Sequence, residues 1–171
     1  CWGRNIYSQL GLGDSVPRPT PTQLSGNDWT DVAVGVDHAC GLQTSNAQTT
    51  LWCWGRNAQG QLGSDLPSST IETIPTASGT DTDWASLSGF DYHMCGLKTG
   101  GELYCWGYNN KNQVSETSAG RLMTPTQIKP GTLYKNVSAG KSYTCAIETN
   151  GTLWCWGQNT QGQLGLGHKQ S

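Results

Sequence analysis

The sequence has few aliphatic side chains and little charge. Leu, Ile, Val and Phe together make up 27 of its 171 residues, and Phe occurs once. Such a low share is also found in disordered chains, but a net charge of −2 gives little repulsion to keep this chain extended. Eight Trp and six Tyr residues can each bury a large area. Together with 23 Gly residues, this composition predicts an all-β fold of many short strands joined by Gly-rich turns.

The sequence also lacks the features of several functional classes. Its ten Lys and Arg residues form no run that could follow a phosphate backbone, so we expect no nucleic-acid partner. No stretch of 18 apolar residues occurs, so we expect no membrane insertion. The P-loop, GxSxG and HExxH motifs are missing. We therefore expect no enzymatic activity, no cofactor and no bound metal.

A repeat organises what the sequence does contain. The tripeptide Cys-Trp-Gly begins at Cys1, Cys53, Cys105 and Cys155, at intervals of 52, 52 and 50 residues. A similar block precedes each of the last three copies, and more variable segments with a Pro-Thr step separate the blocks. We divide the chain into the end of a preceding repeat (1–13), repeat 1 (14–64), repeat 2 (65–116) and repeat 3 (117–171). Together these parts are expected to form one domain or a segment of one.

Apolar residues alternate with a period of two inside each block, which predicts strands rather than helices. Two consecutive strands form a hairpin, and the turn gives its register. With Cys95 opposite Cys105, three residues remain for the loop, 99–101, and the third copy has the same loop length. A Gly at the last loop position suits a type I turn with a G1 bulge, because that residue has a positive φ. The first copy has three more residues, so we expect a longer loop at 45–48.

Cysteines that face each other on antiparallel strands lie within disulfide reach. The register therefore predicts three disulfides, Cys40–Cys53, Cys95–Cys105 and Cys145–Cys155, and with them an oxidising compartment: secreted, periplasmic or at the cell surface. Two alternatives remain open, namely buried free thiols in a cytosolic protein and a zinc site, although the CxxC spacing of zinc sites is missing. Cys1 aligns with the second cysteine of each pair and is expected to stay unpaired within the chain.

These blocks resemble the regulator of chromosome condensation repeat family. The pattern of a Trp, a Gly-x-x-His strand, a Trp-Gly step and a Gly-Gln-Leu-Gly end is carried by Trp29, Gly35, His38, Trp54, Gly55 and 60–63, and in the third copy by Gly140, Trp156, Gly157 and 162–165. The resemblance implies a β-propeller with one four-stranded antiparallel sheet, or blade, per repeat, here of a disulfide-containing secreted type. Three full repeats and an N-terminal partial blade are fewer than the about seven blades usual for the family. We therefore expect part of a larger propeller, in a longer chain or a homo-oligomer.

The second copy departs from the pattern. Phe90 stands where the other copies have Gly35 and Gly140, and "NKNQVS" replaces Gly-Gln-Leu-Gly. We expect an altered turn on one face of that blade.

Most residues that recur are expected to serve packing. The structural aromatics are expected to be Trp29, Trp54, Trp84, Trp106 and Trp156. His38 and His93 hold equivalent places in different blades, so we interpret them as repeat features and not as an acid–base pair. The Asn residues that follow each Trp-Gly step are expected to cap turns; they are Asn5, Asn57, Asn109 and Asn159.

The functions implied by the resemblance fit these residues unequally. Nucleotide exchange on a nuclear GTPase conflicts with the predicted disulfides. Plant ultraviolet receptors of this fold carry Gly-Trp-Arg-His-Thr, but the matching positions here read "GVDHA", "FDYHM" and "GKSYT", without the sensing Trp. Secreted bacterial members, which include a β-lactamase inhibitor, fit the compartment. The preferred hypothesis is an extracellular protein-interaction scaffold that binds a protein partner, or further repeats of the same polypeptide, through loops on one face.

Two other functions remain as alternatives. One is a carbohydrate-binding propeller with Tyr7, Tyr92 and Tyr108 as stacking platforms, and the other is a structural subunit of an extracellular fibre or coat. In the scaffold hypothesis, specificity would come from three variable segments, 14–28, 64–83 and 116–133. Two sequons are possible glycosylation sites: Asn150 at a hairpin tip and, as the poorer candidate at a strand entrance, Asn136.

Overall fold

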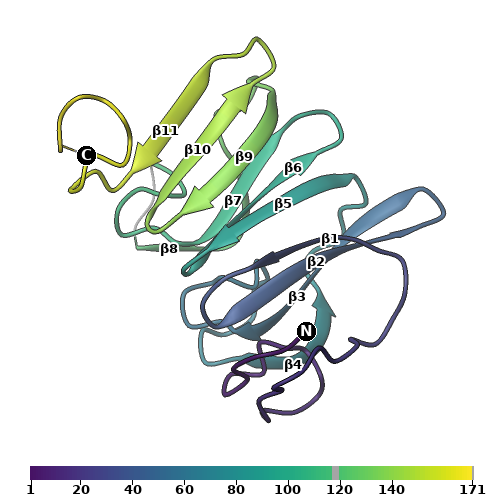
Figure 1. Ribbon diagram of the computed structural model, residues 1–171. Coiled ribbons are helices and arrows are strands. Elements are labelled where there is room, and N and C mark those ends of the chain that lie inside the picture. Colours follow the sequence, from purple (N-terminus) through teal and green to yellow (C-terminus); the bar gives the residue numbers. More distant parts are fainter. Residues whose placement is uncertain (117–119, 171) are drawn as a thin grey trace.

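The computed structural model describes residues 1–116 and 120–170, and its strands form three antiparallel sheets (Figure 1). The first sheet contains β1 (Trp29–Val34), β2 (His38–Ser45), β3 (Gln48–Arg56) and β4 (Ile71–Ala77). The second contains β5 (Trp84–Phe90), β6 (His93–Lys98), β7 (Leu103–Tyr108) and β8 (Arg121–Gln127). The third contains β9 (Tyr134–Gly140), β10 (Tyr143–Glu148) and β11 (Leu153–Gly157). In each sheet the strands follow chain order, which is the arrangement of propeller blades.

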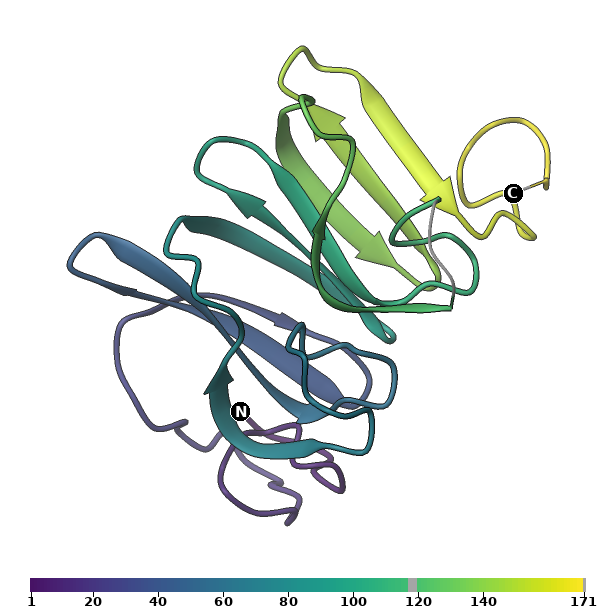
Figure 2. The same cartoon turned by 180° about the vertical axis from the view of Figure 1, so that it is seen from behind.

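The three sheets follow one another in space as they do in the chain (Figures 1 and 2). Their first strands, β1, β5 and β9, lie side by side. The backbone N–H of Leu87 on β5 donates to Asp31 Oδ2 on β1 at 2.7 Å, and that of Ala139 on β9 donates to Ser88 Oγ on β5 at 2.9 Å. Side-chain acceptors on one sheet thus satisfy backbone donors on the next sheet.

The variable Pro-Thr segments form the fourth strands. Pro75 lies in β4 and Pro125 in β8, at the outer edge of the first and second sheets. Proline is tolerated there because an edge strand has N–H groups that need no partner in the sheet. Because β4 lies within 65–116, the first sheet extends from one sequence period into the next. The division of the chain into repeats stays a prediction, and its boundaries at 117 and 171 fall on residues outside the described part.

The N-terminal residues repeat this edge pairing on a smaller scale. Gly3 and Arg18 form an isolated bridge, at the positions where Gly55 pairs with Glu72. The backbone N–H of Thr22 donates to the Cys1 carbonyl at 2.9 Å. Residues 1–22 therefore have the geometry of the end of a third strand followed by a fourth strand, which agrees with the predicted partial blade.

The hairpin register is the predicted one. Cys40 faces Cys53, Cys95 faces Cys105 and Cys145 faces Cys155, and each pair forms a disulfide with Cα atoms 4.0 to 4.1 Å apart. Gly101 and Gly151, the last loop residues, have φ values of 92° and 95°. Cys1 is a free, exposed thiol.

The first hairpin has a shorter turn than the predicted loop at 45–48. Ser45 pairs with Gln48, so the strands continue up to a two-residue turn, Asn46-Ala47. Both turn residues have positive φ, 50° and 61°, as a type I′ turn requires. The extra residues of this copy therefore lengthen β2 and β3 instead of the loop.

The core lies between neighbouring sheets and contains most of the predicted aromatics. Trp54, Trp84 and Trp106 are almost completely buried. Trp84 and Trp106 meet edge to face with ring centroids 5.9 Å apart. Trp29 and Trp156 are half-buried. Each of these two lies toward one end of the stack of sheets, where one side of the ring has no neighbouring sheet among the described residues.

Candidate functional site

The Trp of the Trp-Gly step connects its own sheet to the loop of the preceding repeat. Trp54 Nε1 donates to the Gln9 carbonyl and Trp106 Nε1 to the Gln61 carbonyl, each at 3.0 Å. A Cβ at Gly63 would lie 2.8 Å from Trp106 Nε1, which is too close for any side chain. The Gly-Gln-Leu-Gly end is thus a docking site for the next indole ring.

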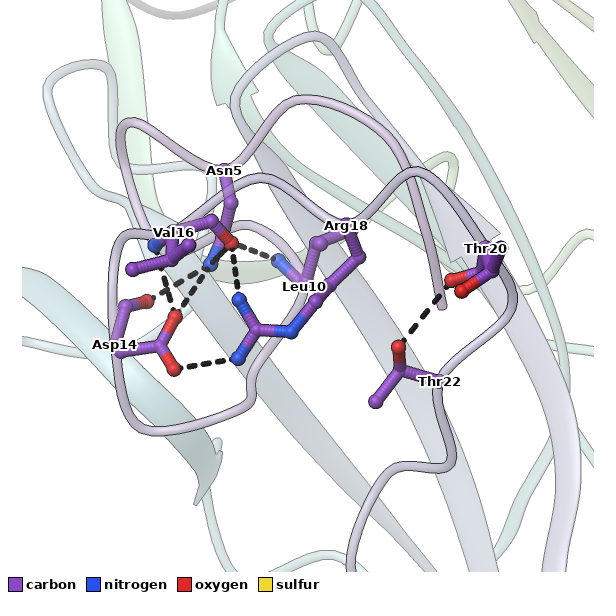
Figure 3. Close-up of polar contacts among 7 residues, drawn as sticks. All are labelled: Asn5, Leu10, Asp14, Val16, Arg18, Thr20 and Thr22. Atoms are coloured by element: carbon purple, nitrogen blue, oxygen red, sulfur yellow. Dashed lines mark hydrogen bonds and ion pairs between the residues drawn. The ribbon is translucent and has the colours of Figure 1, made fainter.

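The recurring Asn residues hold these loops in shape, as predicted. Asn5 Oδ1 accepts the backbone N–H of Leu10 at 2.9 Å, and Asn5 Nδ2 donates to the carbonyls of Asp14 and Val16 (Figure 3). Asn57, Asn109 and Asn159 accept the corresponding N–H of Leu62, Val114 and Leu164. These side chains are buried, and their hydrogen bonds give them a structural role.

Arg18 closes the N-terminal loop. Its Nη2 lies 2.6 Å from Asp14 Oδ2, and its Nη1 donates to the Val16 carbonyl at 2.6 Å (Figure 3). The hydrogen bond from Arg18 holds the pKa of Asp14 below its usual value. The Thr20-Pro21-Thr22 stretch continues from this loop as the fourth-strand segment, with Thr22 Oγ1 donating to the Thr20 carbonyl (Figure 3).

The two repeated histidines are buried and neutral. Burial lowers the pKa of His38 to about 3, with a smaller contribution from His93, and burial lowers the pKa of His93 to about 4. Thr144 Oγ1 donates its single proton to the Gln113 carbonyl at 2.7 Å. His93 Nε2 lies 3.0 Å from this Thr144 Oγ1. Because the hydroxyl has no second proton to donate, His93 Nε2 must carry the proton and donate it to Thr144. These contacts describe a packing role for His93 between the second and third sheets.

A charged cluster lies where β3 ends and β1 turns into β2. Arg4 Nη1 is 3.7 Å from Asp37 Oδ1, and Arg56 Nη1 is 3.5 Å from Asp37 Oδ2. The Asp37 side chain is 4% exposed and that of Arg4 is 57% exposed. Tyr7 lies near both arginines, with the Arg56 guanidinium 4.6 Å and the Arg4 guanidinium 5.8 Å from its ring centroid. We call Arg4, Tyr7, Asp37 and Arg56 the arginine cluster.

The tyrosines proposed for sugar stacking are all half-buried. Arg56 covers part of the Tyr7 ring, and Asn110 Nδ2 donates to Tyr108 Oη at 2.7 Å. Tyr92 lies in the turn between β5 and β6. The ring area of Tyr7 that a sugar could stack on is therefore reduced.

The variable segments do not lie on a single face of the molecule. Segment 64–83 includes the whole of β4, and segment 116–133 includes the whole of β8, while its residues 117–119 lie outside the described part. Each segment therefore runs from the loop end of its sheet to the hairpin end. The two sequons are exposed: Asn150 lies in the β10–β11 turn, and Asn136 lies within β9 opposite Ile147, not at the entrance of the strand.

Sequence reasoning did not find the groove beside β11. Its volume is about 610 Å³, and its walls include Val114, Trp154, Trp156 and Leu164. The missing Gly-Gln-Leu-Gly end in the second copy was a signal of altered packing here, because Ser115 stands at the place of Gly63.

Two kinds of feature are missing from the described part of the chain. Among residues 1–116 and 120–170, no three His, Cys, Asp or Glu side chains lie together as metal ligands. The same part of the chain has no helix of the length and apolarity that crossing a membrane demands.

This chain is similar to parts of several longer proteins. It is 28% identical to the ultraviolet-B receptor UVR8 of Arabidopsis thaliana over 98% of its length, which is 39% of that receptor. It is 29% identical to the probable E3 ubiquitin-protein ligase HERC4 of Homo sapiens, over 82% of this chain and 14% of that one. The chain thus spans less than half of these relatives.

Solved structures show the same fold. Yeast RCC1 (Prp20), seen bound to Kap60, matches 99% of this chain with a TM-score of 0.81 and 24% identity, and 42% of its own chain is covered. The ectodomain of the receptor kinase CR4 of Physcomitrella patens matches 92% of this chain, and the match covers 35% of the ectodomain chain. The TM-score is 0.53 and the identity is 22%. The described sheets are therefore part of a propeller.

The family model for the regulator of chromosome condensation (RCC1) repeat matches residues 29–61, 88–113 and 134–163, and a second model of the same repeat matches residues 1–42. These stretches contain the three hairpins and their disulfides described above. The chain belongs to the regulator of chromosome condensation repeat family.

Proposed function

We propose that this chain is an extracellular protein-interaction scaffold without catalytic activity, and that the arginine cluster contacts an acidic surface of its partner. The observation that carries the proposal is the unequal charge of the cluster. Two guanidinium groups share one buried carboxylate, Asp37, so one positive charge remains at the surface. Arginine with an adjacent aromatic ring is a frequent source of binding energy in protein interfaces.

The surroundings of the arginine cluster also fit an interface. Ile6 is 50% exposed and Val36 45% exposed, and both belong to the same loops as the cluster. Exposed apolar residues around a charged anchor can exclude water from the contact. The Asp37 side chain is buried, so its position is fixed, and its carboxylate attracts both arginines. The arginines are therefore positioned before a partner arrives, which lowers the entropy lost on binding.

The compartment and the relatives support the same function. Disulfides such as the three found here persist in oxidising compartments. RCC1 propellers bind other proteins: yeast RCC1 binds Kap60, and the binding of Prp20p of Saccharomyces cerevisiae to Gsp1p and histones has been studied. The partner of this chain would be a different, extracellular protein.

A single charge reversal tests the proposal. The wild-type chain would be used to capture partners from the extracellular medium of its source, followed by cross-linking and mass spectrometry. Arg4→Glu is expected to abolish the capture of a specific partner, whereas Lys135→Glu, an equal charge change on exposed β9, is expected to leave it unchanged. Arg4→Lys should restore part of the binding. Thermal melting of all variants controls for folding.

Two outcomes would contradict the proposal. One is a partner whose capture is unaffected both by Arg4→Glu and by exchange of segments 14–28, 64–83 and 116–133. The other is capture that does not weaken with salt, because a contact based on surface charge is screened at high ionic strength.

A further inference from the structure

Phe90, the last residue of β5, stands where the other two sheets have glycine. A Cβ at Gly35 would overlap the His38 ring, which would have to move. A Cβ at Gly140 would overlap the Tyr143 ring in the same way. Phe90 is the only Phe of the sequence, and it is 49% exposed. The second sheet therefore carries an exposed aromatic side chain at a position where packing in the other sheets requires glycine.

Phe90 is exposed although its sheet has a neighbouring sheet on each side. Strand β5 lies between β1 and β9 (Figure 1), and the hydrogen bonds described above join it to both. The backbone of Phe90 is held within β5 because it pairs with His93 on β6. The ring is thus presented from a fixed backbone, which lowers the entropy that would be lost when a partner covers it.

The turn after Phe90 also differs from its counterpart in the third sheet, as the sequence predicts for this blade. Asp91 follows Phe90 directly and has a φ of 53°. In the third sheet the positive φ, 61°, falls one residue later, at Ser142. Asp adopts this left-handed conformation more readily than most residues do. The side chain and the backbone of this turn thus depart from the third repeat together.

This turn is in contact with the loop that carries the buried carboxylate of the arginine cluster. The Val36 N–H donates to the Asp91 carbonyl at 3.0 Å. Val36 directly precedes Asp37, which both arginines of the cluster share. Val36 is itself 45% exposed. We call Phe90 and Val36 the Phe90 patch, an apolar area beside the arginine cluster.

The charged groups around the Phe90 patch have a small excess of positive charge. Burial raises the pKa of Asp91, and the nearby Lys141 lowers it to a smaller extent. With the arginine cluster, three cations accompany two carboxylates, so one positive charge remains; the cations are Arg4, Arg56 and Lys141, and the carboxylates are Asp37 and Asp91. A surface of this kind is complementary to a partner with carboxylates beside an apolar side chain.

We propose that the Phe90 patch and the arginine cluster together bind a protein segment in which an aromatic or aliphatic side chain lies next to carboxylates. This inference rests on the proposed function and names the chemistry of the partner. A carboxylate of the segment would pair with Arg4, and its apolar side chain would pack on Phe90. Charge would set the rate of association, whereas the apolar contact would set the lifetime of the complex. The carboxylates among the cations disfavour an anionic membrane surface, which attracts clusters of cations.

Two acidic polymers separate the effect of charge from that of the apolar contact. Fluorescein-labelled polyglutamate and a labelled copolymer of glutamate and tyrosine, matched in their number of glutamates, would be titrated with the full chain and followed by anisotropy. The copolymer is expected to bind about ten-fold more tightly, the factor that burial of part of an aromatic ring would produce. Phe90→Gly, which introduces the residue of the other two sheets, should remove this difference and leave polyglutamate binding unchanged. Arg4→Glu should weaken the binding of both polymers.

Leu133→Gly is the matched control. Leu133 is 43% exposed and precedes β9, at the end of that strand away from Gly140, the counterpart of Phe90. This variant should bind both polymers as the wild-type chain does. Melting temperatures of all variants show whether the fold is intact.

Three results would overturn the inference. They are equal binding of the two polymers to the wild-type chain, an equal effect of Phe90→Gly and Leu133→Gly, and binding to vesicles of phosphatidylserine and phosphatidylcholine that Phe90→Gly abolishes. In the last case the Phe90 patch contacts a membrane. If Phe90→Gly has no effect while Arg4→Glu weakens both polymers, this inference fails and the proposed function stands. If Arg4→Glu has no effect, the contact of the arginine cluster with an acidic partner fails as well.

Discussion

The contact between the first and second sheets and the contact between the second and third use different side chains at equivalent positions. In the first contact, Trp106 is completely buried and its indole N–H donates to the Gln61 carbonyl over Gly63. In the second contact, the equivalent Trp156 is half-buried, and the hydroxyl of Thr144 donates to the Gln113 carbonyl.

One position in the docking loop also differs between the two contacts. Gly63 has no side chain, so the indole ring can approach its backbone, whereas Ser115 stands at the same place in the second repeat. The carbonyl is satisfied in both contacts, but by an indole in one and by a hydroxyl in the other. A repeat can therefore keep its backbone hydrogen bonds while it changes the packing between sheets, and the second contact leaves Trp156 at the wall of the groove.

Reduction of the disulfides is expected to have the largest effect. Each bridge closes a short loop and contributes about 2–3 kcal/mol, so complete reduction should unfold a chain with so few aliphatic residues. Cys145–Cys155, in the third sheet, is half-buried, whereas the other two bridges are fully buried. Graded reduction followed by alkylation and mass spectrometry should label Cys145 and Cys155 first. Simultaneous labelling of all six would show that the two contacts open together.

Acidification is the next largest effect. The pKa values of His38 and His93 in the folded chain, about 3 and about 4, lie below the usual 6.5. The unfolded chain therefore takes up protons first as the pH drops below about 6.5. The free energy of unfolding should fall down to about pH 4 for the contribution of His93 and about pH 3 for that of His38, by about 1.4 kcal/mol per histidine and pKa unit of difference. Urea unfolding at a series of pH values measures the slope of the free energy of unfolding against pH. His93→Gln should reduce this slope by the contribution of His93, which lies in the second contact. A slope that is unchanged in His93→Gln would contradict the assignment.

The first contact can be broken at Gly63. Gly63→Val is expected to cost about 3 kcal/mol, because the side chain meets the Trp106 indole and the residue has a φ of 65°. Gly165 is the matched control: its φ is 70°, but no atom lies within 4 Å of a Cβ built there. Gly165→Val should therefore cost about 1 kcal/mol, from backbone strain alone. Equal urea midpoints for the two variants would show that the indole contact is unimportant.

The second contact can be broken at Thr144 with the smallest effect of the four. Thr144→Val keeps the shape of the side chain but removes the acceptor of His93 Nε2 and the donor to the Gln113 carbonyl, and should cost about 2 kcal/mol. Thr30→Val, at an exposed position of β1, is the control and should change the urea midpoint little. If Thr144→Val were as mild as the control, water would be replacing the hydroxyl.

Much of the fold could be predicted from the sequence because local chemistry determines it. The spacing of Cys95 and Cys105 and the Gly at the last loop position agree on one hairpin register, which the structure shows. The turn of the first hairpin could not be predicted in this way, since two residues with positive φ, Asn46 and Ala47, compete with a longer loop of the same composition.

The candidate sites depend on contacts between distant residues and were less accessible. Arg4 and Arg56 hold equivalent repeat positions, but their shared contact with Asp37 depends on how two neighbouring repeats are placed. Likewise the groove exists because β11, Val114 and Leu166 come together from three parts of the chain. Sequence spacing describes each repeat well, and the surfaces between repeats only indirectly.

The offset between sequence period and sheet has an evolutionary consequence. Because β4 belongs to the period that follows the rest of its sheet, every period contributes strands to two sheets. Duplication or loss of one period by recombination, at whatever point of the period it starts, therefore adds or removes one complete sheet's worth of strands. A gene built in this way can change its number of blades without an exact breakpoint, and each new blade is tied to its neighbour from the moment it arises.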